Sequence, residues 1–395
     1  MFKPELLAPA GDIEKLKVAF HYGADAVYIG GKAFSLRARA SNFDIEDIKE
    51  ACDIAHALNK KVYVTTNIIP HNKDIDGLVE YLKALEEVEV DAIICASPVV
   101  IETAKAHTNL EIHISTQLSV TNHLGAEFFK DMGAERVVMA RELSLDEIRD
   151  VKNNSDIDLE VFIHGGMCVS YSGRCTLSNN LTDRDANRGG CAHSCRWNYD
   201  LYQDDDKLND DISFSMSSKD LQTVKDISNL IDIGVHSLKI EGRMKSIHYI
   251  ATVVSTYRRL IDDICDEYDL DLPKYLLQIK KAENRLTSHG FMHGMTTVNE
   301  QLYNMRSENP TQEFVGIVRA YDKETHEVLI EQRNYFKDGD VLEVFSPHFE
   351  PLTFRVENMT DDKGEPLDVA RHPKQLIRFK IPFNVNPLDI LRKIK

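Results

Sequence analysis

Short apolar runs alternate with amphipathic helical stretches along the first two thirds of the chain, which predicts repeated strand–helix units. Apolar residues recur every three to four positions in segments such as 13–22, 45–58, 75–88 and 145–153, which indicates helices. The runs predicted as strands are 6–9, 26–29, 61–65, 92–95, 111–115, 136–139, 159–164 and 237–241. Such repeats give parallel strands with right-handed crossovers, and eight of them predict an α/β fold, a closed (β/α)8 TIM-like barrel. An open doubly wound sheet is the alternative.

The strand–helix pattern is interrupted once, between the seventh and eighth predicted strands. Residues 165–218 form an insertion rich in Gly, Asn, Asp and Cys. Within it we expect a hairpin between 198–203 and 212–216, and after it a helix over 220–231. Loops that follow barrel strands form the active face of this fold, so the insertion is where chemistry is expected.

The last quarter of the chain changes its period from about 3.6 to two, which predicts strands. A helix over 246–265 and an irregular linker precede this region. The predicted domains are therefore a barrel over 1–270, a linker over 271–312 and a small β-barrel over 313–395. The strands expected in this last domain are 316–320, 328–331, 341–345, 352–356 and 376–380.

Composition describes an ordinary globular protein, with 43% hydrophobic and 28% charged residues among 395. We find no signal peptide and no apolar run long enough for a bilayer, so a cytoplasmic protein without a membrane partner is expected. The net charge of −17 argues against non-specific nucleic-acid binding over the whole surface. The last 25 residues lean basic and could still contact an RNA locally; their cations are Arg371, Lys374, Arg378, Lys380, Arg392, Lys393 and Lys395.

Four of the seven cysteines fall within 28 residues of the insertion, with the spacing Cys168-x6-Cys175-x15-Cys191-x3-Cys195. In a reducing compartment such a cluster indicates a metal site rather than disulfides. Either tetrahedral zinc or an iron–sulfur cluster suits four thiolates, and His193 could replace one thiolate around zinc. The chain lacks the tight Cys-x2-Cys knuckle that is typical of structural zinc, which favours a 4Fe–4S cluster.

Three blocks of the chain resemble the signatures of peptidase family U32. They are EVFIHGGMCVSYSGRCTLS at 160–178, NRGGCAHSCRW at 187–197 and LKIEGRMKS at 238–246. The segments 5–11 and 26–31 resemble the N-terminal part of the family, so the resemblance covers nearly the whole chain. Gly166 stands where the signature usually has Ala or Ser, a small departure that leaves the neighbouring Cys168 in place.

The resemblance implies a function that the spacing alone does not. Members were first named collagenases or proteases, whereas better-supported members act in oxygen insertion. These members hydroxylate carbon 5 of a tRNA wobble uridine with the help of prephenate, hydroxylate a ribosomal RNA cytidine, or assist ubiquinone hydroxylation with a 4Fe–4S cluster. Chain length and the C-terminal domain are most similar to the tRNA-hydroxylating branch. The ligands that the resemblance implies are Cys168, Cys175, Cys191 and Cys195.

The expected partners are tRNA and prephenate, with a paralogous U32 subunit or a second copy of the chain. A peptidase is the alternative, although the chain has neither a Gly-x-Ser-x-Gly elbow nor a His-Glu-x-x-His pair. An rRNA hydroxylase and a redox-sensing scaffold are further alternatives.

Prephenate carries two carboxylates, so its site needs cations, ideally arginines that bind both oxygens. The arginines predicted to bind substrate are Arg37, Arg141, Arg174, Arg188 and Arg196. The residues predicted to be catalytic are His164, Lys239 and Arg243, at or near the ends of the last two barrel strands. Strand-end residues that could orient a substrate are Asn67, Thr116 and Gln117, and possible stacking surfaces are Phe34, Tyr171 and Trp197.

Overall fold

Eight parallel strands close into a barrel in the computed structural model. The structure describes residues 2–36, 42–208, 214–282, 285–302 and 313–393. The last strand, β11, pairs in parallel with both β7 and β1, and this closes the cylinder. The barrel strands are β1 (Glu5–Pro9), β2 (Ala26–Gly30), β3 (Lys61–Thr66), β4 (Ala92–Cys95), β5 (Glu111–Ile114), β6 (Arg136–Val138), β7 (Asp158–Gly165) and β11 (Ser237–Ile240). The predicted TIM-like barrel is confirmed.

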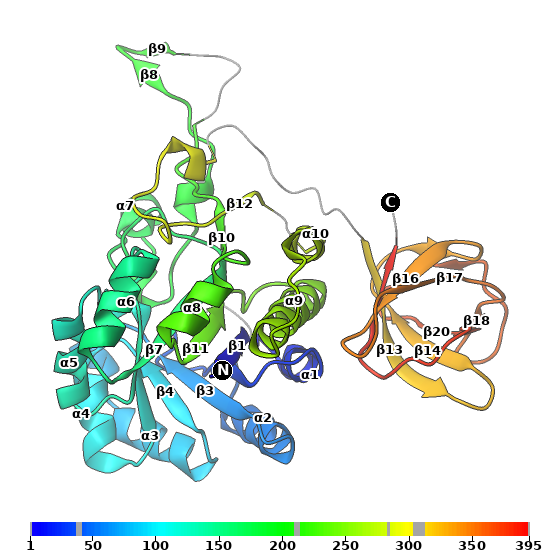
Figure 1. The fold of residues 1–395 in the computed structure, drawn as a ribbon, viewed down its shortest axis with the longest axis horizontal. Helices are drawn as coiled ribbons and strands as arrows, with labels where there is room; N and C mark the ends of the chain where they lie inside the picture. The colour runs from blue at the N-terminus through cyan, green and yellow to red at the C-terminus, as the bar shows by residue number, and fades with distance from the viewer. Residues whose placement is uncertain (1, 37–41, 209–213, 283–284, 303–312, 394–395) are drawn as a thin grey trace.

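Helices cover the outside of the barrel, as Figure 1 shows. Their apolar stripes pack against the strands, and side-chain caps such as Asp12, Asp44 and Ser144 fix where three of them begin. The outer helices are α1 (Ile13–His21), α2 (Ile45–Ala57), α3 (Leu78–Glu87), α4 (Pro98–His107), α5 (His123–Asp131), α6 (Leu145–Asn154), α8 (Ile227–Ile233) and α9 (Ile247–Cys265). None of the helices in the described part of the chain combines the length and the apolar character needed to cross a membrane.

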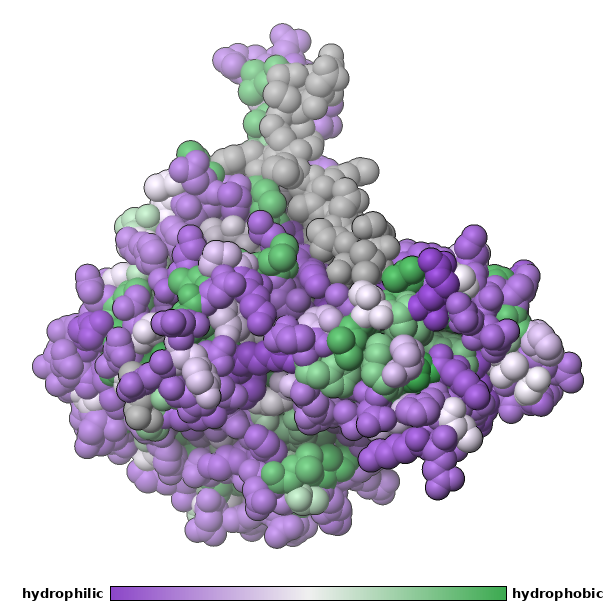
Figure 2. Space-filling model, turned by 45° about the vertical axis from the view of Figure 1, so that its right-hand side comes forward, coloured by the Kyte–Doolittle hydropathy of each residue, from purple (hydrophilic) through white to green (hydrophobic). Residues whose placement is uncertain are grey.

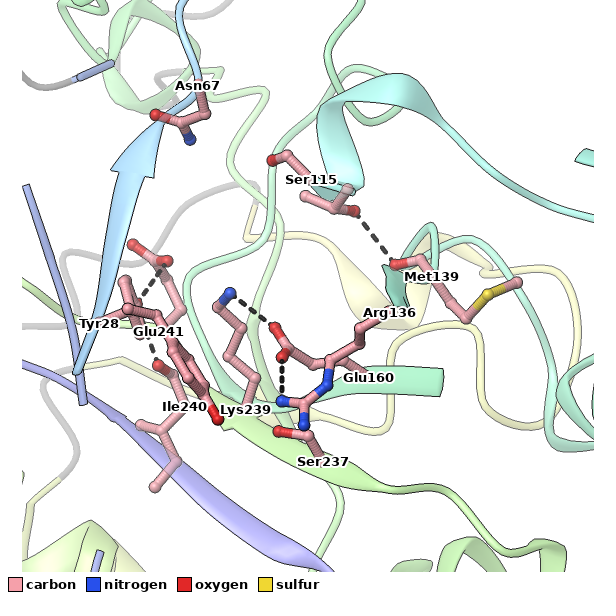
Figure 3. Close-up of polar contacts among 12 residues, drawn as sticks. Tyr28, Asn67, Ser115, Arg136, Met139, Glu160, Ser237, Lys239, Ile240 and Glu241 are labelled. Carbon is pink, nitrogen blue, oxygen red and sulfur yellow. Dashed lines mark hydrogen bonds and ion pairs between the residues drawn. The ribbon is translucent and has the colours of Figure 1, made fainter. Parts of the chain in front are cut away.

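The barrel interior combines apolar residues with buried charges. Lys239 Nζ lies 2.7 Å from Glu160 Oε1, and Arg136 Nη1 lies 3.3 Å from Glu160 Oε2 (Figure 3). Arg136 also pairs with Glu5 at 2.7 Å, and the Glu5 carboxylate accepts a hydrogen bond from Tyr63. Glu160 is fully buried, so its charge depends on these two cations.

The insertion after β7 consists of short elements that rise above the barrel: α7 (Leu177–Thr182), η3 (Ala186–Arg188), η4 (Ser194–Arg196), β8 (Tyr202–Gln203) and β9 (Asp206–Lys207). The predicted hairpin turns earlier than expected, because β8 pairs directly with β9 across Asp204 and Asp205, which both have positive φ. A bridge between Tyr199 and Phe214 joins its base, while residues 212–213 of the expected second strand lie outside the described residues.

The helix predicted over 220–231 is wrong at its start. Residues Asp220–Gln222 form β10, which pairs antiparallel with the end of β7, and α8 begins only at Ile227. Tertiary pairing therefore overrides the local helical pattern. Leu221 of β10 packs on Met167, Phe162 and Val138, so β10 also fixes the base of the insertion over the barrel.

The linker predicted as irregular contains α10 (Leu272–Lys280), β12 (Thr287–Ser288) and η5 (Val298–Glu300). Proline at position 273 stands in the first turn of α10, where the missing N–H costs nothing, so it begins a helix instead of preventing one. Tyr275 and Ile279 are buried in the main core, which joins α10 to the barrel domain.

Residues from Glu313 onward form an antiparallel β domain with a core of its own. Its main sheet has the strand order β17-β16-β21-β13-β14-β20-β18. The strands are β13 (Glu313–Asp322), β14 (Glu327–Gln332), β16 (Val341–Phe345), β17 (Leu352–Arg355), β18 (Thr360–Asp361), β20 (Leu376–Lys380) and β21 (Ile390–Lys393), with a separate pair, β15 (Phe336–Lys337) and β19 (Val369–Ala370). The domain docks on the barrel through Tyr22, whose hydroxyl donates to the Phe345 carbonyl at 2.7 Å.

Candidate active site at the barrel mouth

The first cysteine segment, residues 168–175, is held on the loops that follow β5 and β6 at the mouth of the barrel, the end where the barrel strands finish. Glu142 accepts hydrogen bonds from the Ser172 backbone N–H at 3.0 Å and from its hydroxyl. Gly173 adopts a left-handed conformation with φ +72°, and a Cβ there would lie 2.1 Å from the Gln117 carbonyl oxygen. Only glycine permits this close approach, which sets the position of the chain between Cys168 and Cys175.

The second cysteine segment, residues 187–195, is held on the loop after β3. The Arg188 guanidinium reaches both carboxylate oxygens of Asp74 at 2.6 Å, and the Asn187 carbonyl accepts the Ile69 N–H at 3.1 Å. The Asn187 side-chain amide also donates to the Cys175 carbonyl at 3.1 Å. This last contact joins the two cysteine segments to each other.

All four cysteines of the insertion are free thiols in one region of the mouth. Burial raises the pKa of the Cys195 thiol, Arg196 lowers it, and Cys168, Cys191 and Cys175 each raise it further. Charge effects of this kind fall off with distance, so the four sulfurs share a neighbourhood. The four thiols thus influence one another's charge, while their convergence on one metal group and their role as ligands stay predictions.

The donor set consists of four thiols whose pKa values depend on their neighbours. Cys168 is an exposed residue, yet burial of its thiol raises the pKa, which the neighbouring Arg141 and Arg196 counteract. Among the described residues, no three His, Cys, Asp or Glu side chains stand close enough to hold one metal ion. Four thiolates are the usual ligands of structural zinc and of iron–sulfur clusters alike, so the choice between them stays a prediction.

Charged and aromatic side chains form a connected group at the ends of β2, β6, β7 and β11. The Arg141 guanidinium lies 3.8 Å from the centre of the Phe162 ring and 3.9 Å from Glu241 Oε2. Glu241 Oε2 also lies 3.2 Å from the Tyr28 hydroxyl, as Figure 3 shows. Sequence reasoning did not single out Glu241, although its place directly after the last barrel strand was the available signal.

Amide and hydroxyl groups form a second wall of the mouth, at the ends of β3 and β5. Asn67 Nδ2 donates to Gln117 Oε1 at 2.7 Å, and the Ser115 hydroxyl donates to the same oxygen at 2.9 Å. Gln117 in turn donates to the Asn67 carbonyl at 3.0 Å. The Thr116 hydroxyl instead donates to the Met139 carbonyl at 3.1 Å. Asn67 and Gln117 thus lie together as a preorganised polar surface.

Two of the residues predicted to be catalytic lie in buried contacts with the protein. Lys239 points into the barrel, where it pairs with Glu160 and lies over the Tyr28 ring at 4.6 Å. His164 Nδ1 lies 3.2 Å from the Tyr257 hydroxyl of α9, and burial lowers the pKa of its ring to about 4. A neutral His164 is therefore expected near pH 7, and a catalytic role for either residue stays a prediction.

Arg243, the third of these residues, crosses the end of β2. Its guanidinium bonds Asn42 Oδ1 at 2.8 Å and the Ser35 hydroxyl at 3.2 Å. A Cβ on Gly30 would lie 2.1 Å from this guanidinium, so the glycine makes room for it. Arg243 is thus held at the mouth within a polar cradle, and its predicted role in binding or catalysis stays a prediction.

The arginines predicted to bind substrate are distributed unevenly. Arg141 lies over the Phe162 ring, and Arg196 lies against Gly166, where a Cβ would be 2.8 Å from its Nη2. Arg174 is exposed beside Cys175, and Arg188 is engaged with Asp74. Arg37 lies outside the described residues.

Exposed aromatic and apolar residues surround the cysteine segments. Tyr171 and Trp197 are about half exposed, while Phe34 instead packs against the main core. The part of the insertion that carries β8 and β9 projects above the barrel. Figure 2 shows hydrophobic residues on this projection, on a mainly hydrophilic surface. The exposed apolar residues of this projection are Leu201, Tyr202 and Leu208.

Comparison with known proteins gives relatives over the whole chain. It is 49% identical over 402 residues to "tRNA hydroxylation protein P1" of Bacillus subtilis, an alignment that covers 100% of this chain and 95% of that protein. It is 39% identical over 263 residues to the 23S rRNA 5-hydroxycytidine synthase of Escherichia coli, covering 67% of this chain and 40% of that protein. The solved structure of the U32 peptidase Mk0906 is 14% identical, with a TM-score of 0.37, and covers 42% of this chain and 72% of that one.

Two family models cover nearly all of the chain. Residues 11–302 match the model of peptidase family U32, and residues 310–392 match the model of the peptidase family U32 C-terminal domain. The boundary between the two matches falls within the segment that precedes the β domain. This protein belongs to peptidase family U32.

Proposed function

We propose that this protein hydroxylates carbon 5 of a wobble uridine in tRNA, with prephenate as co-substrate and a 4Fe–4S cluster held by Cys168, Cys175, Cys191 and Cys195. The observation that carries the proposal is a set of four free thiols, which influence one another's charge, on an insertion held by the loops after β3, β5 and β6. Support also comes from the relative named a tRNA hydroxylation protein, which is 49% identical over the full chain.

The donor set fits the proposed cluster. Thiolates are the usual ligands of iron–sulfur clusters, and each of the four cysteines is free to lose its proton to a metal. Arg141 and Arg196 favour the anionic form of Cys168, so they would offset the negative charge of four thiolates. When bound, the cluster would supply redox chemistry that protein side chains do not perform unaided.

The residues of the mouth would bind and orient the two substrates. Arg141 and Arg243 lie at the mouth and are the cations that we assign to the prephenate carboxylates. The pairing of Arg141 with Glu241 at 3.9 Å is loose, so a ligand carboxylate can compete for this guanidinium. Arg188 is already engaged by both oxygens of Asp74, which favours a positioning role for it over substrate binding.

The base would enter the mouth from outside the RNA helix. Atoms at carbon 5 of a pyrimidine inside a stack are shielded, so enzymes of this kind act on flipped or single-stranded nucleotides. Asn67 and Gln117 carry the amide donors and acceptors that can pair with a uracil edge, and Trp197 and Tyr171 offer half-exposed rings for stacking. In this proposal the base is recognised by Asn67 and Gln117, at the ends of β3 and β5.

Deletion of the gene followed by mass spectrometry of tRNA and rRNA nucleosides tests the proposal. We expect 5-hydroxyuridine derivatives in tRNA to disappear and to return with the wild-type gene but not with Cys191→Ala. Cys265→Ala is the matched control, because Cys265 ends α9 away from the insertion and should restore the modification fully. Loss of a hydroxycytidine from rRNA with unchanged tRNA would favour the rRNA alternative, and unchanged nucleosides in both would reject RNA hydroxylation.

A further inference from the structure

The two-stranded ribbon of β15 and β19 presents one polar face to solvent. Its register pairs Phe336 with Ala370 and Lys337 with Val369. Side chains alternate along strands, and Phe336 and Ala370 are fully buried, so Lys337 lies on the outer face. Tyr335 and Arg371 flank the ribbon directly next to the Phe336–Ala370 pair, and both are exposed, Tyr335 to 49%.

The turn after β19 adds cations to this face. Arg371, His372 and Lys374 are exposed, and the turn is tied to the end of β14 because the Lys374 N–H donates to the Gln332 carbonyl at 3.0 Å. Residues 369–380 contain four Lys and Arg and no acidic residue. Asp338 and Asp368 lie at the opposite end of the ribbon, joined by a backbone hydrogen bond of 3.0 Å. Lys337 therefore adjoins the acidic end, and its backbone N–H donates to Asp340, whereas Tyr335, Arg371 and Lys374 stand at the other, cationic end.

The segment that leads into the ribbon contacts a helix that begins on the mouth side of the barrel. Arg333, two residues before Tyr335, pairs with Glu14 at 2.5 Å, and Arg319 pairs with the same carboxylate. Glu14 is in the first turn of α1, which follows β1 after the capping residue Asp12. Helices of this barrel begin on the side where the strands end, which is the side of the mouth. Figure 1 shows the β domain against α1 and α9.

The β domain repels a polyanion less than the remainder of the chain taken together. Residues 313–395 contain 13 Lys and Arg against 15 Asp and Glu, whereas the remaining residues contain 34 against 49. This domain thus carries a net charge of −2 of the total of −17. An RNA that reaches the mouth can therefore approach over this domain with little net repulsion.

We propose that Tyr335, Lys337, Arg371 and Lys374, together the ribbon platform, bind the tRNA outside the nucleotide that enters the mouth. The cations contact phosphates, and the Tyr335 ring stacks on an unpaired base, the combination that single-stranded nucleic-acid sites use. This inference rests on the proposed function, because it names where the proposed tRNA substrate is held.

Fluorescence anisotropy with a labelled, unmodified tRNA transcript that has uridine at the wobble position tests the platform. The full-length protein with its cofactor is titrated at several salt concentrations. We expect the triple variant Lys337→Glu, Arg371→Glu, Lys374→Glu to bind at least about tenfold more weakly, with a salt slope smaller by about two to three. The matched control reverses three other exposed lysines, Lys83→Glu, Lys323→Glu and Lys363→Glu, and should bind within about twofold of the wild type.

A neutral set and an aromatic variant sharpen the result. The same three positions changed to Gln should weaken binding less than the Glu set, and Tyr335→Ala should weaken it about threefold to tenfold without changing the salt slope. Equal binding by the triple variant and the control variant would overturn the inference. So would absence of tRNA binding by the wild type, or a triple variant that loses only self-association in sedimentation experiments.

The platform and the proposed function can fail separately. If deletion abolishes tRNA hydroxylation but the triple variant binds tRNA normally, the platform is wrong and the function stands. If tRNA nucleosides are unchanged on deletion but the triple variant alone loses tRNA binding, the function is wrong and the platform stands.

Discussion

Charged and reactive groups have opposite surroundings in the barrel interior and in the cysteine insertion. Inside the barrel, Glu160, Lys239 and Arg136 are buried and paired, and each stands on a strand of the closed sheet. In the insertion, the thiols are exposed or half-buried and stand on short segments. The barrel is therefore stabilised by contacts among its own strands and helices. The order of the cysteine insertion depends instead on its contacts with the barrel loops and on the group that the thiols bind.

Element lengths explain this difference. The helices of the insertion have six residues in α7 and three in η3 and η4, too short to be stable alone. The contacts of Gly173, Asn187 and Arg188 therefore carry its order, and such regions open at low free energy. The single tryptophan, Trp197, lies in the insertion, so its fluorescence reports on that region while far-ultraviolet circular dichroism reports mainly on the barrel.

Removal of the central carboxylate should have the largest effect on the barrel. Glu160→Ala leaves Lys239 buried without a partner and should lower the free energy of unfolding by about 3–5 kcal/mol, measured by guanidinium denaturation followed by circular dichroism. The double variant Glu160→Leu, Lys239→Met is the control, because Arg136 keeps Glu5 at 2.7 Å and no lone charge remains. It should recover most of the lost stability. If this stable double variant loses tRNA modification, Lys239 acts in the chemistry; if the single change costs nothing, the interior pairs are not structural.

The sequence predicts these two regions to different depths. Apolar runs located all eight barrel strands, and the cysteine spacing located four free thiols on one insertion, whose convergence stays a prediction. The partner of Lys239 is 79 residues away, and the approach of Gly173 to Gln117 joins two different loops, so local patterns contain neither contact. A register shift in the β7–β11 pairing, between Lys239 and Ile240, occurs beside His164, whose ring packs on α9; periodicity does not predict such an irregularity.

Acid should destabilise the barrel through His164, at the end of the strand that leads into the insertion. Its folded pKa of about 4 lies below the ordinary value of 6.5, so between these pH values the unfolded chain binds the proton and the folded chain does not. Stability should therefore fall as pH falls from 6.5 to 4, by about 3 kcal/mol in all from this residue. His164→Gln should flatten the pH dependence in this window by about one proton, measured on protein stripped of its cofactor. Parallel curves for variant and wild type would show that His164 is not the group responsible.

Gly173→Ala should loosen the insertion and leave the barrel intact. The left-handed backbone costs an alanine about 1–2 kcal/mol, and the contact with the Gln117 carbonyl adds to this, so the loop between Cys168 and Cys175 should lift. We expect a changed Trp197 fluorescence, faster proteolysis within the insertion and less bound iron, with an unchanged midpoint by circular dichroism. Gly77→Ala is the matched control, since Gly77 has φ +80° and nothing within 4 Å of an added Cβ. Similar behaviour of the two variants would mean that backbone strain, and not the contact with Gln117, explains the result.

The smallest effect should come from the ion pair that holds the second cysteine segment, and it separates two roles for Arg188. The pKa of Asp74 is lowered, first by the hydrogen bond from the His71 N–H and then by Arg188, so both partners are charged near neutral pH. Solvent reaches this pair, so Arg188→Lys and Asp74→Asn should each increase the proteolysis rate of the insertion by only about twofold to threefold.

Two roles of Arg188 give different results in these variants. If Arg188 only positions the segment, both changes should weaken the binding of prephenate. If Arg188 instead binds a substrate carboxylate, Asp74→Asn releases the guanidinium and should strengthen prephenate binding while Arg188→Lys weakens it, because lysine cannot reproduce the two-pronged contact. The arrangement of Arg188 on both Asp74 oxygens favours the first outcome, in which the residue that spacing suggested for substrate binding serves to hold Cys191 and Cys195 over the barrel.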